Sequence, residues 1–166
     1  QHYYFSNIID LTNKGYEMSL TYNEKIGDFN FNVTGNFSSI KNNVDELSTG
    51  SQVLEGSRGA FHGAPITYSK VGYPIYSFFL VDTDGLFRSQ AEIDAHTKNG
   101  TLIQPNAQVG DVRYVDYNGD GEINGEDRQY KGSAFPKFEY GLRLQGDWKG
   151  IDCAIALQGV EGNKIY

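Results

Sequence analysis

Apolar and polar side chains alternate in two segments near the start of the chain, 15–23 and 28–38. A period of two is typical of β-strands that have one apolar and one polar face. The linker between the two segments is short enough to predict an antiparallel hairpin. The apolar faces consist of Tyr16, Met18, Leu20, Tyr22, Phe29, Phe31, Val33 and Phe37.

The same alternation returns near the other end of the chain, in 139–148 and 151–158. Lys149 and Gly150 between them suit the centre of a tight turn, so a second hairpin is expected. Its apolar positions are Tyr140, Leu142, Leu144, Trp148, Ile151, Cys153, Ile155 and Leu157. Its first strand carries Glu139, Arg143, Gln145 and Asp147 on the polar face.

Two architectures explain this pattern, because alternation shows only that one face of each strand avoids water. In a soluble sandwich the apolar faces meet inside, whereas in a transmembrane barrel they contact lipid. Strands of roughly nine or ten residues match the length that crosses a bilayer when tilted. Short turns combined with a long intervening region favour the barrel, whose long loops lie outside the cell. We therefore expect an all-β fold with barrel hairpins at 1–38 and 137–166 and an extracellular loop region at 39–136.

The amino-acid composition excludes several classes of function. The 166 residues include 20 Gly, 12 Tyr and 10 Phe, which favours strands joined by turns. A net charge of −7 gives no electrostatic basis for binding nucleic acid. The single cysteine excludes an intrachain disulfide framework, and the three histidines are isolated in sequence. No catalytic or zinc-binding spacing is present, so we predict that the chain is not an enzyme.

Within the loop region, two elements are predicted. The apolar run 75–81 indicates a short buried strand. Ser89 stands three residues before Glu92, which is the spacing of a capping box, and Gly100 is a suitable end. A short helix is therefore expected over 89–100.

The segment "DYNGDGEINGED", residues 116–127, concentrates carboxylates and amides around two glycines. Its spacing resembles the calcium loop of EF-hands, with Gly121 at the position of the sharp turn. Asp127 replaces the usual bidentate Glu at position twelve, as in dockerin-like loops. We predict a structural Ca²⁺ bound by Asp116, Asn118, Asp120, Glu122, Asn124 and Asp127. The alternative is a loop of Asx-turns whose carboxylates accept backbone N–H groups.

Several segments occur in a specific order: "NKGYEMSLTYN", "GDFNFNVTGNFS", "VGYPIYSFFLVDTDGLF", "GDVRYVDYNGDGEINGEDRQY", "PKFEYG", "KGID" and "QGVEGNKIY". Together they resemble the C-terminal barrel region of SusC/RagA-type TonB-linked outer-membrane proteins, over nearly the whole chain. The resemblance implies a piece of a plugged barrel of the 22-stranded class in the bacterial outer membrane.

The resemblance also implies a function. Members of this family import oligosaccharides, or in some cases peptides, across the outer membrane of Bacteroidetes-type bacteria. TonB supplies the energy through a part of the protein absent from this sequence, and a SusD-like lipoprotein closes the extracellular mouth. The expected partners are therefore TonB, the lipoprotein, outer-membrane lipid and a glycan or peptide substrate.

Substrate contacts are expected from two places. Arg143 would line the channel wall, and Tyr73, Tyr76 and Phe78 of the loop region would stack on sugar rings. The alternative for these aromatic residues is that they pack the loop.

Two other functions remain open from the residues alone. One is a soluble, secreted, calcium-stabilised β-domain that binds carbohydrate. The other is a glycosidase, which needs two carboxylates at a controlled separation across a cleft. The acidic residues here are concentrated in the 116–127 loop, which disfavours the glycosidase.

Overall fold

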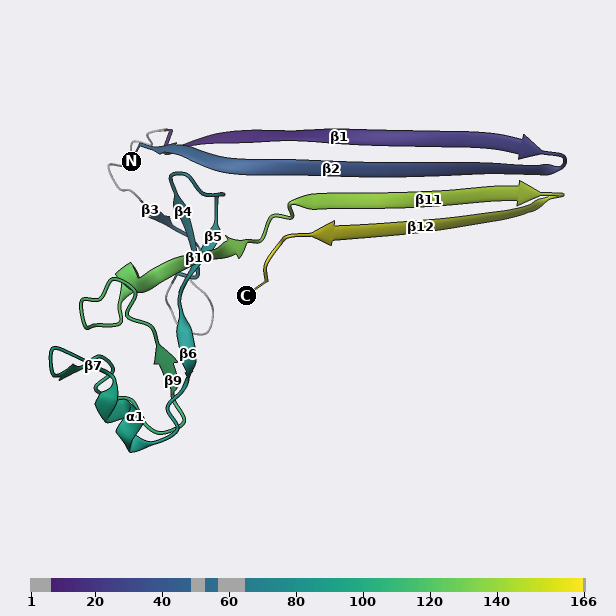
Figure 1. Ribbon diagram of the computed structural model, residues 1–166. Coiled ribbons are helices and arrows are strands. Elements are labelled where there is room, and N and C mark those ends of the chain that lie inside the picture. The colour runs from purple at the N-terminus through teal and green to yellow at the C-terminus, as the bar shows by residue number, and fades with distance from the viewer. Residues whose placement is uncertain (1–6, 49–52, 57–64, 166) are drawn as a thin grey trace, which may run out of the picture.

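The computed structural model describes residues 7–48, 53–56 and 65–165. Four long strands form one antiparallel sheet in the order β1-β2-β11-β12 (Figure 1). Their bounds are β1 (Ile9–Ile26), β2 (Phe29–Leu47), β11 (Phe138–Trp148) and β12 (Ile151–Glu161). The two predicted hairpins are confirmed, and they lie side by side because β2 pairs with β11 from Phe29↔Trp148 to Ser38↔Glu139. Both hairpin turns lie at the same end of the sheet (Figure 1).

The turns follow from residues that tolerate a left-handed backbone. Trp148 pairs with Ile151, so Lys149 and Gly150 alone make the second turn, with φ of 49° and 84°. Positive φ at both central residues is what a type I′ hairpin turn requires, and Gly adopts it without steric cost. Lys149 Nζ lies 3.6 Å from Oδ2 of Asp28 in the first turn, so the two turns are also linked by charge.

Two strands are longer than predicted. β1 has 18 residues and β2 has 19, so both continue well past the alternating segments. Beyond Gly15 and Ser38 the polar residues occupy both faces, yet Lys14 still pairs with Lys41 and Asn13 with Asn42. A backbone ladder needs no apolar face, so the alternation revealed only the portion of each strand that avoids water.

A second antiparallel sheet lies at the end of the long sheet opposite the hairpin turns (Figure 1). Its order is β10 (Arg128–Ser133), β5 (Ser77–Val81), β4 (Thr67–Lys70) and β3 (Val53–Glu55). β5 confirms the buried strand predicted at 75–81. The core of this part includes Val44, Leu47, Tyr68 and Phe79, all at most 9% exposed. Val44 of β2 links the long sheet to the turn between β4 and β5, because its N–H donates to Tyr73 O at 2.9 Å.

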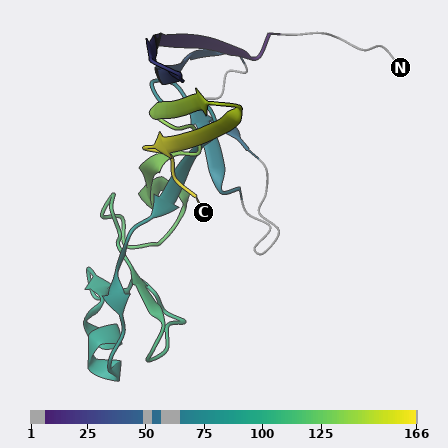
Figure 2. The same cartoon turned by 90° about the vertical axis from the view of Figure 1, so that its right-hand side faces the viewer.

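A distal lobe extends away from both sheets (Figure 1). It contains β6 (Thr83–Leu86), α1 (Gln90–Ala95), β7 (Thr97–Lys98), β8 (Thr101–Leu102) and β9 (Val112–Tyr114). The 3₁₀ turn η1 (Gly125–Asp127) leads from the acidic loop into β10 and contacts β5. Phe87 and Ile93 form the core of the lobe, 1% and 3% exposed. Figure 2, turned so that the hairpin turns face the viewer, shows this lobe well below the long strands.

The helix in the lobe is shorter than predicted. Ser89 caps it as expected, since its Oγ accepts the N–H of Glu92 at 3.3 Å. The helix ends at Ala95 because Asn99 and Gly100, with φ of 51° and 81°, turn β7 into β8 instead. Asn-Gly is a strong signal for a hairpin turn, so the chain forms a hairpin here and the helix predicted to reach residue 100 stops earlier. Among the described residues, no helix is both long and apolar enough to cross a membrane.

Candidate functional site

The long sheet has one apolar and one polar face. Its pairing places Tyr22, Val33, Leu144 and Ile155 in one row across all four strands. Nothing among the described residues covers this face: Tyr16, Leu20 and Ile151 are 68%, 74% and 66% exposed. The apolar side chains therefore do not interlock with a second layer, as the soluble sandwich would require.

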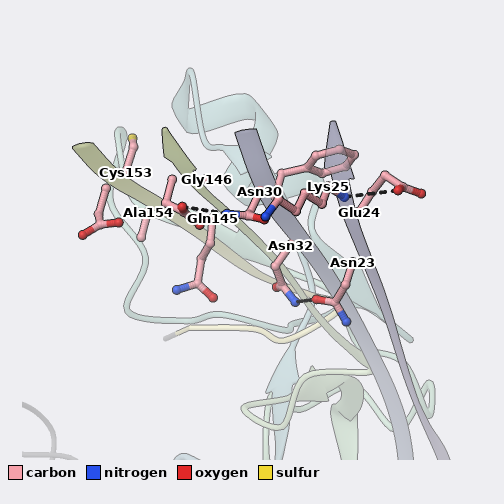
Figure 3. A pocket seen from close by; sticks show the side chains of 12 residues that line it. Asn23, Glu24, Lys25, Asn30, Asn32, Gln145, Gly146, Cys153 and Ala154 are labelled. Atoms are coloured by element: carbon pink, nitrogen blue, oxygen red, sulfur yellow. Dashed lines mark hydrogen bonds between the residues drawn. The ribbon is translucent and has the colours of Figure 1, made fainter. Parts of the chain in front are cut away.

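The opposite face carries amides and charges. The adjacent row contains Asn23, Asn32 and Gln145, and Figure 3 shows these three side chains pointing to the same side of the sheet. They line a hollow of about 710 Å³ near the hairpin turns. Asn30 Nδ2 donates to Asp147 Oδ1 at 2.8 Å in the same hollow, and Asn32 donates to Asn23. This face can therefore offer both donors and acceptors to a polar occupant.

A second hollow, of about 870 Å³, lies farther from the turns and contains Arg143. Thr34 and Ala156 flank Arg143 across the neighbouring strands. Within the described part of the chain, Arg143 forms no ion pair, although Glu17 and Glu139 line the same hollow. The guanidinium predicted to contact substrate is thus available on the polar face.

The three loop aromatics predicted to contact substrate lie in different surroundings. Tyr73 packs into an aromatic cluster, with its ring centroid 5.2 Å from that of Phe79 and 5.0 Å from that of Tyr130. Phe78 is half-buried in β5. Tyr76 is 50% exposed and has a positive φ of 51°, which is uncommon for a bulky residue. Of the three, Tyr76 is the one presented to solvent, and its role stays a prediction.

In the acidic loop, Asp116 holds the backbone of the following turn. Its Oδ1 accepts the N–H groups of Gly119 and Asp120 at 2.7 and 3.1 Å, and its Oδ2 accepts that of Gly121 at 2.9 Å. Gly121 has φ of 96°, as the sharp turn demands.

Asp127 closes the loop from its other end and is fully buried. Its Oδ1 accepts the N–H of Tyr117 at 2.8 Å, and its Oδ2 accepts that of Asn124 at 2.8 Å. A short carboxylate suits this position because both oxygens must reach backbone groups nearby. These contacts match the Asx-turn alternative.

Asp120 is exposed, as are Glu122 and Glu126 of the same loop. The side-chain amide of Asn118, followed by the N–H of Glu122, lowers the pKa of Asp120 below its ordinary value, because both stabilise the charged form. In the part of the chain that the structure describes, no three acidic, histidine or cysteine side chains are grouped as a metal ion would require. Asp116 Oδ2 and Asp127 Oδ2 each accept one backbone N–H, which leaves each of them a lone pair. Calcium binding stays a prediction.

Comparison with known proteins gives two relatives from Formosa agariphila. TonB-dependent receptor P26 is 34% identical over 161 residues, and TonB-dependent receptor P3 is 28% identical over 162. Structures of the RagAB peptide transporter share the fold, with TM-scores of 0.61 to 0.63 at 17% to 19% identity over 93% to 95% of this chain. The chain belongs to the TonB-dependent receptors. No family model matches it.

This receptor segment spans 16% of the length of each curated relative and 15% to 16% of each RagAB chain. The family resemblance seen in the sequence is therefore confirmed over 96% of the segment. The division into 1–38, 39–136 and 137–166 stays a prediction. Sequence reasoning missed one feature of the receptor segment, a polar pocket in the distal lobe around His96 and Arg113. His96 and Arg113 are 17 residues apart in sequence and no motif pairs them, so only the fold brings them together.

Proposed function

We propose that this segment forms part of the wall of a TonB-dependent importer in the bacterial outer membrane. The observation that carries the proposal is the uncovered apolar face of the four-stranded sheet. Exposing that many large apolar side chains to water would be unfavourable, whereas contact with lipid makes it favourable. The names of the curated relatives and the fold shared with RagAB support the same assignment.

In this proposal the polar face lines the lumen and the hairpin turns face the periplasm. Short turns on the periplasmic side are the rule in outer-membrane barrels. The second sheet and the distal lobe then lie outside the cell, where a SusD-like lipoprotein would contact the receptor. The fold shared with the RagAB peptide importer supports a partner of this kind.

The proposed substrate is an oligosaccharide or a peptide. Both are rich in hydrogen-bonding groups, and the hollows around Gln145 and Arg143 offer amide, carboxylate and guanidinium partners. Substrate class is tested by uptake of labelled oligosaccharides and labelled peptides into cells that make the full-length receptor. We expect uptake of one class to need both the receptor and TonB. Full-length receptor that stays in the aqueous fraction without detergent would contradict the proposal.

We also propose that a structural calcium ion binds the 116–127 loop. The supporting observation is the spacing of Asp116, Asp120 and Asp127 along the loop, which resembles that of calcium ligands in EF-hand loops. The ion would hold the lobe in shape and would take no part in transport chemistry.

A further inference from the structure

A pocket of about 520 Å³ lies in the distal lobe, between α1, β9 and the acidic loop. It is separate from the polar face of the long sheet, which lies in another part of the molecule (Figure 1). The pocket is of the size that takes one sugar or amino-acid unit. Its polar lining includes Asp84, Glu92, His96, Lys98, Arg113 and Asp116.

Two polar atoms in this lining are buried and have no partner within the described residues: His96 Nε2 and Arg113 Nε. Arg113 uses Nη2 to bind Asp84 Oδ2 at 2.8 Å, which leaves its Nε–H unsatisfied. The His96 ring is held by an edge-on contact with Phe87, 5.5 Å between centroids. Buried polar groups without a partner are rare in proteins and call for a specific explanation.

Each of the three carboxylates around the pocket already has at least one partner. Glu92 Oε2 accepts the N–H of Arg88 at 2.8 Å, and Asp84 pairs with Arg113. Both oxygens of Asp116 accept backbone N–H groups. The nitrogen groups of the lining that remain available are the Arg113 Nε–H, the His96 Nε2 and the Lys98 ammonium. Lys98 forms no ion pair within the described residues.

We propose that this pocket binds the carboxylate group of a small ligand. A carboxylate is acceptor-only and planar, so it suits a lining whose unpaired groups are the Arg113 Nε–H and His96 Nε2. Lys98 adds a positive charge at the same pocket. A uronic sugar and the free end of a peptide both carry this group. That the ligand is a sugar or a peptide rests on the proposed function. That the pocket binds a carboxylate does not depend on it.

The test uses the full-length receptor in detergent and isothermal titration. One arm compares sodium glucuronate with glucose, and the other compares an acetylated dipeptide acid with the corresponding amide. We expect the acid to bind at least tenfold more tightly than its neutral counterpart in one arm, and that arm names the source. Equal affinity within both arms, or no binding of either acid by folded receptor, would overturn the proposal.

Variants test the residues. Arg113→Lys retains the charge that pairs with Asp84 but removes the Nε–H, and His96→Phe removes the ring nitrogen while retaining an aromatic ring. We expect each to weaken binding of the acid about tenfold or more. The matched control is Arg88→Gln, because Arg88 is exposed beside the pocket and does not line it. Unchanged binding in folded Arg113→Lys and His96→Phe, or an equal loss in Arg88→Gln, would refute the site.

Failure of the carboxylate pocket can be distinguished from failure of the proposed transport function. A receptor that inserts into the outer membrane and imports substrate, but binds neither acid, contradicts only the pocket. A receptor that fails to insert contradicts the transport proposal instead.

Discussion

Leu144 and Gln145 are neighbours in β11, yet they lie on opposite faces of the sheet. Leu144 pairs with Val33 and Ile155, and Gln145 pairs with Asn32 and Ala154. One step along the strand thus separates an apolar row from an amide row. Because the side chains of a strand alternate strictly, these two residues report which face contacts lipid.

Leu144→Arg in the full-length receptor is expected to impair assembly into the outer membrane. An arginine on the lipid face costs about 2–4 kcal/mol near the bilayer midplane. Gln145→Arg is the matched control and should assemble normally, since its side chain projects into the polar face. The measurement is the amount of folded receptor in the outer-membrane fraction. Equal tolerance of both substitutions would contradict the assigned faces.

Gly150→Val is expected to destabilise the second hairpin. Gly150 has φ of 84°, and a residue with a side chain pays roughly 1–2 kcal/mol in that region. Gly35→Ala is the control, because a Cβ at Gly35 meets nothing within 4 Å and its φ is not positive. The midpoint of urea unfolding of the receptor in detergent should fall for Gly150→Val alone. A fall of the same size in Gly35→Ala would show that the turn is not the cause.

Tyr73→Ala and Tyr76→Ala are expected to have different effects. Tyr73 packs against Phe79 and Tyr130, so its removal should lower stability by about 1–3 kcal/mol. Tyr76 is half exposed, so its removal should leave the melting temperature almost unchanged and weaken substrate affinity if the ring stacks on substrate. Thermal unfolding and substrate titration separate the two. Unchanged affinity in Tyr76→Ala would remove it from the substrate-contacting residues.

Calcium is expected to raise the melting temperature of the receptor, and a chelator should lower it. The ion would bind the folded loop and not the unfolded chain, so its binding stabilises the fold by mass action. Asp127→Ala should abolish the calcium response and also lower stability without calcium, since it removes the acceptor for the N–H groups of Tyr117 and Asn124. An unchanged melting temperature with and without calcium would leave the Asx-turns as the whole explanation of the loop.

Acidic pH should lower the stability that Asp120 gives to the folded loop. Its hydrogen bonds with Asn118 and Glu122 lower the pKa from 3.8, so the folded state holds its proton less tightly than the unfolded state. The stabilisation is therefore complete above the unfolded value and is lost as the pH falls through the lower folded value. The melting-temperature difference between the wild type and Asp120→Asn should be constant near neutral pH and shrink below about pH 4. A difference that is independent of pH would contradict this.

Much of the fold could be predicted because its signals are local. Alternation over 15–23 and 28–38 defined the faces, and Lys149-Gly150 defined a turn. The pairing of β2 with β11 had no local signal, since Phe37 and Tyr140 are far apart in sequence and meet only in the folded sheet. The ends of β1 and β2 were missed because their polar extensions carry no alternation.

The candidate sites also include residues that local sequence signals could place and residues that only the fold could place. Arg143 was placed correctly on the polar face, because strand parity alone assigns it. Whether Tyr73 packs or faces solvent depends on Phe79 and Tyr130, which no pattern could place beside it. The pocket of His96 and Arg113 is likewise a product of the fold, since α1 and β9 bring its residues together.

The most direct test of the account uses Cys153, the single cysteine of this segment, which is exposed on the apolar face. A fluorophore on Cys153, in full-length receptor with any other cysteines replaced, is compared with one on Ala154→Cys in a Cys153→Ser background. After reconstitution with lipids that carry a quencher on their acyl chains, the account predicts strong quenching at 153 and little at 154. Equal quenching at both positions, or stronger quenching at 154, would contradict the assignment of the apolar face to lipid.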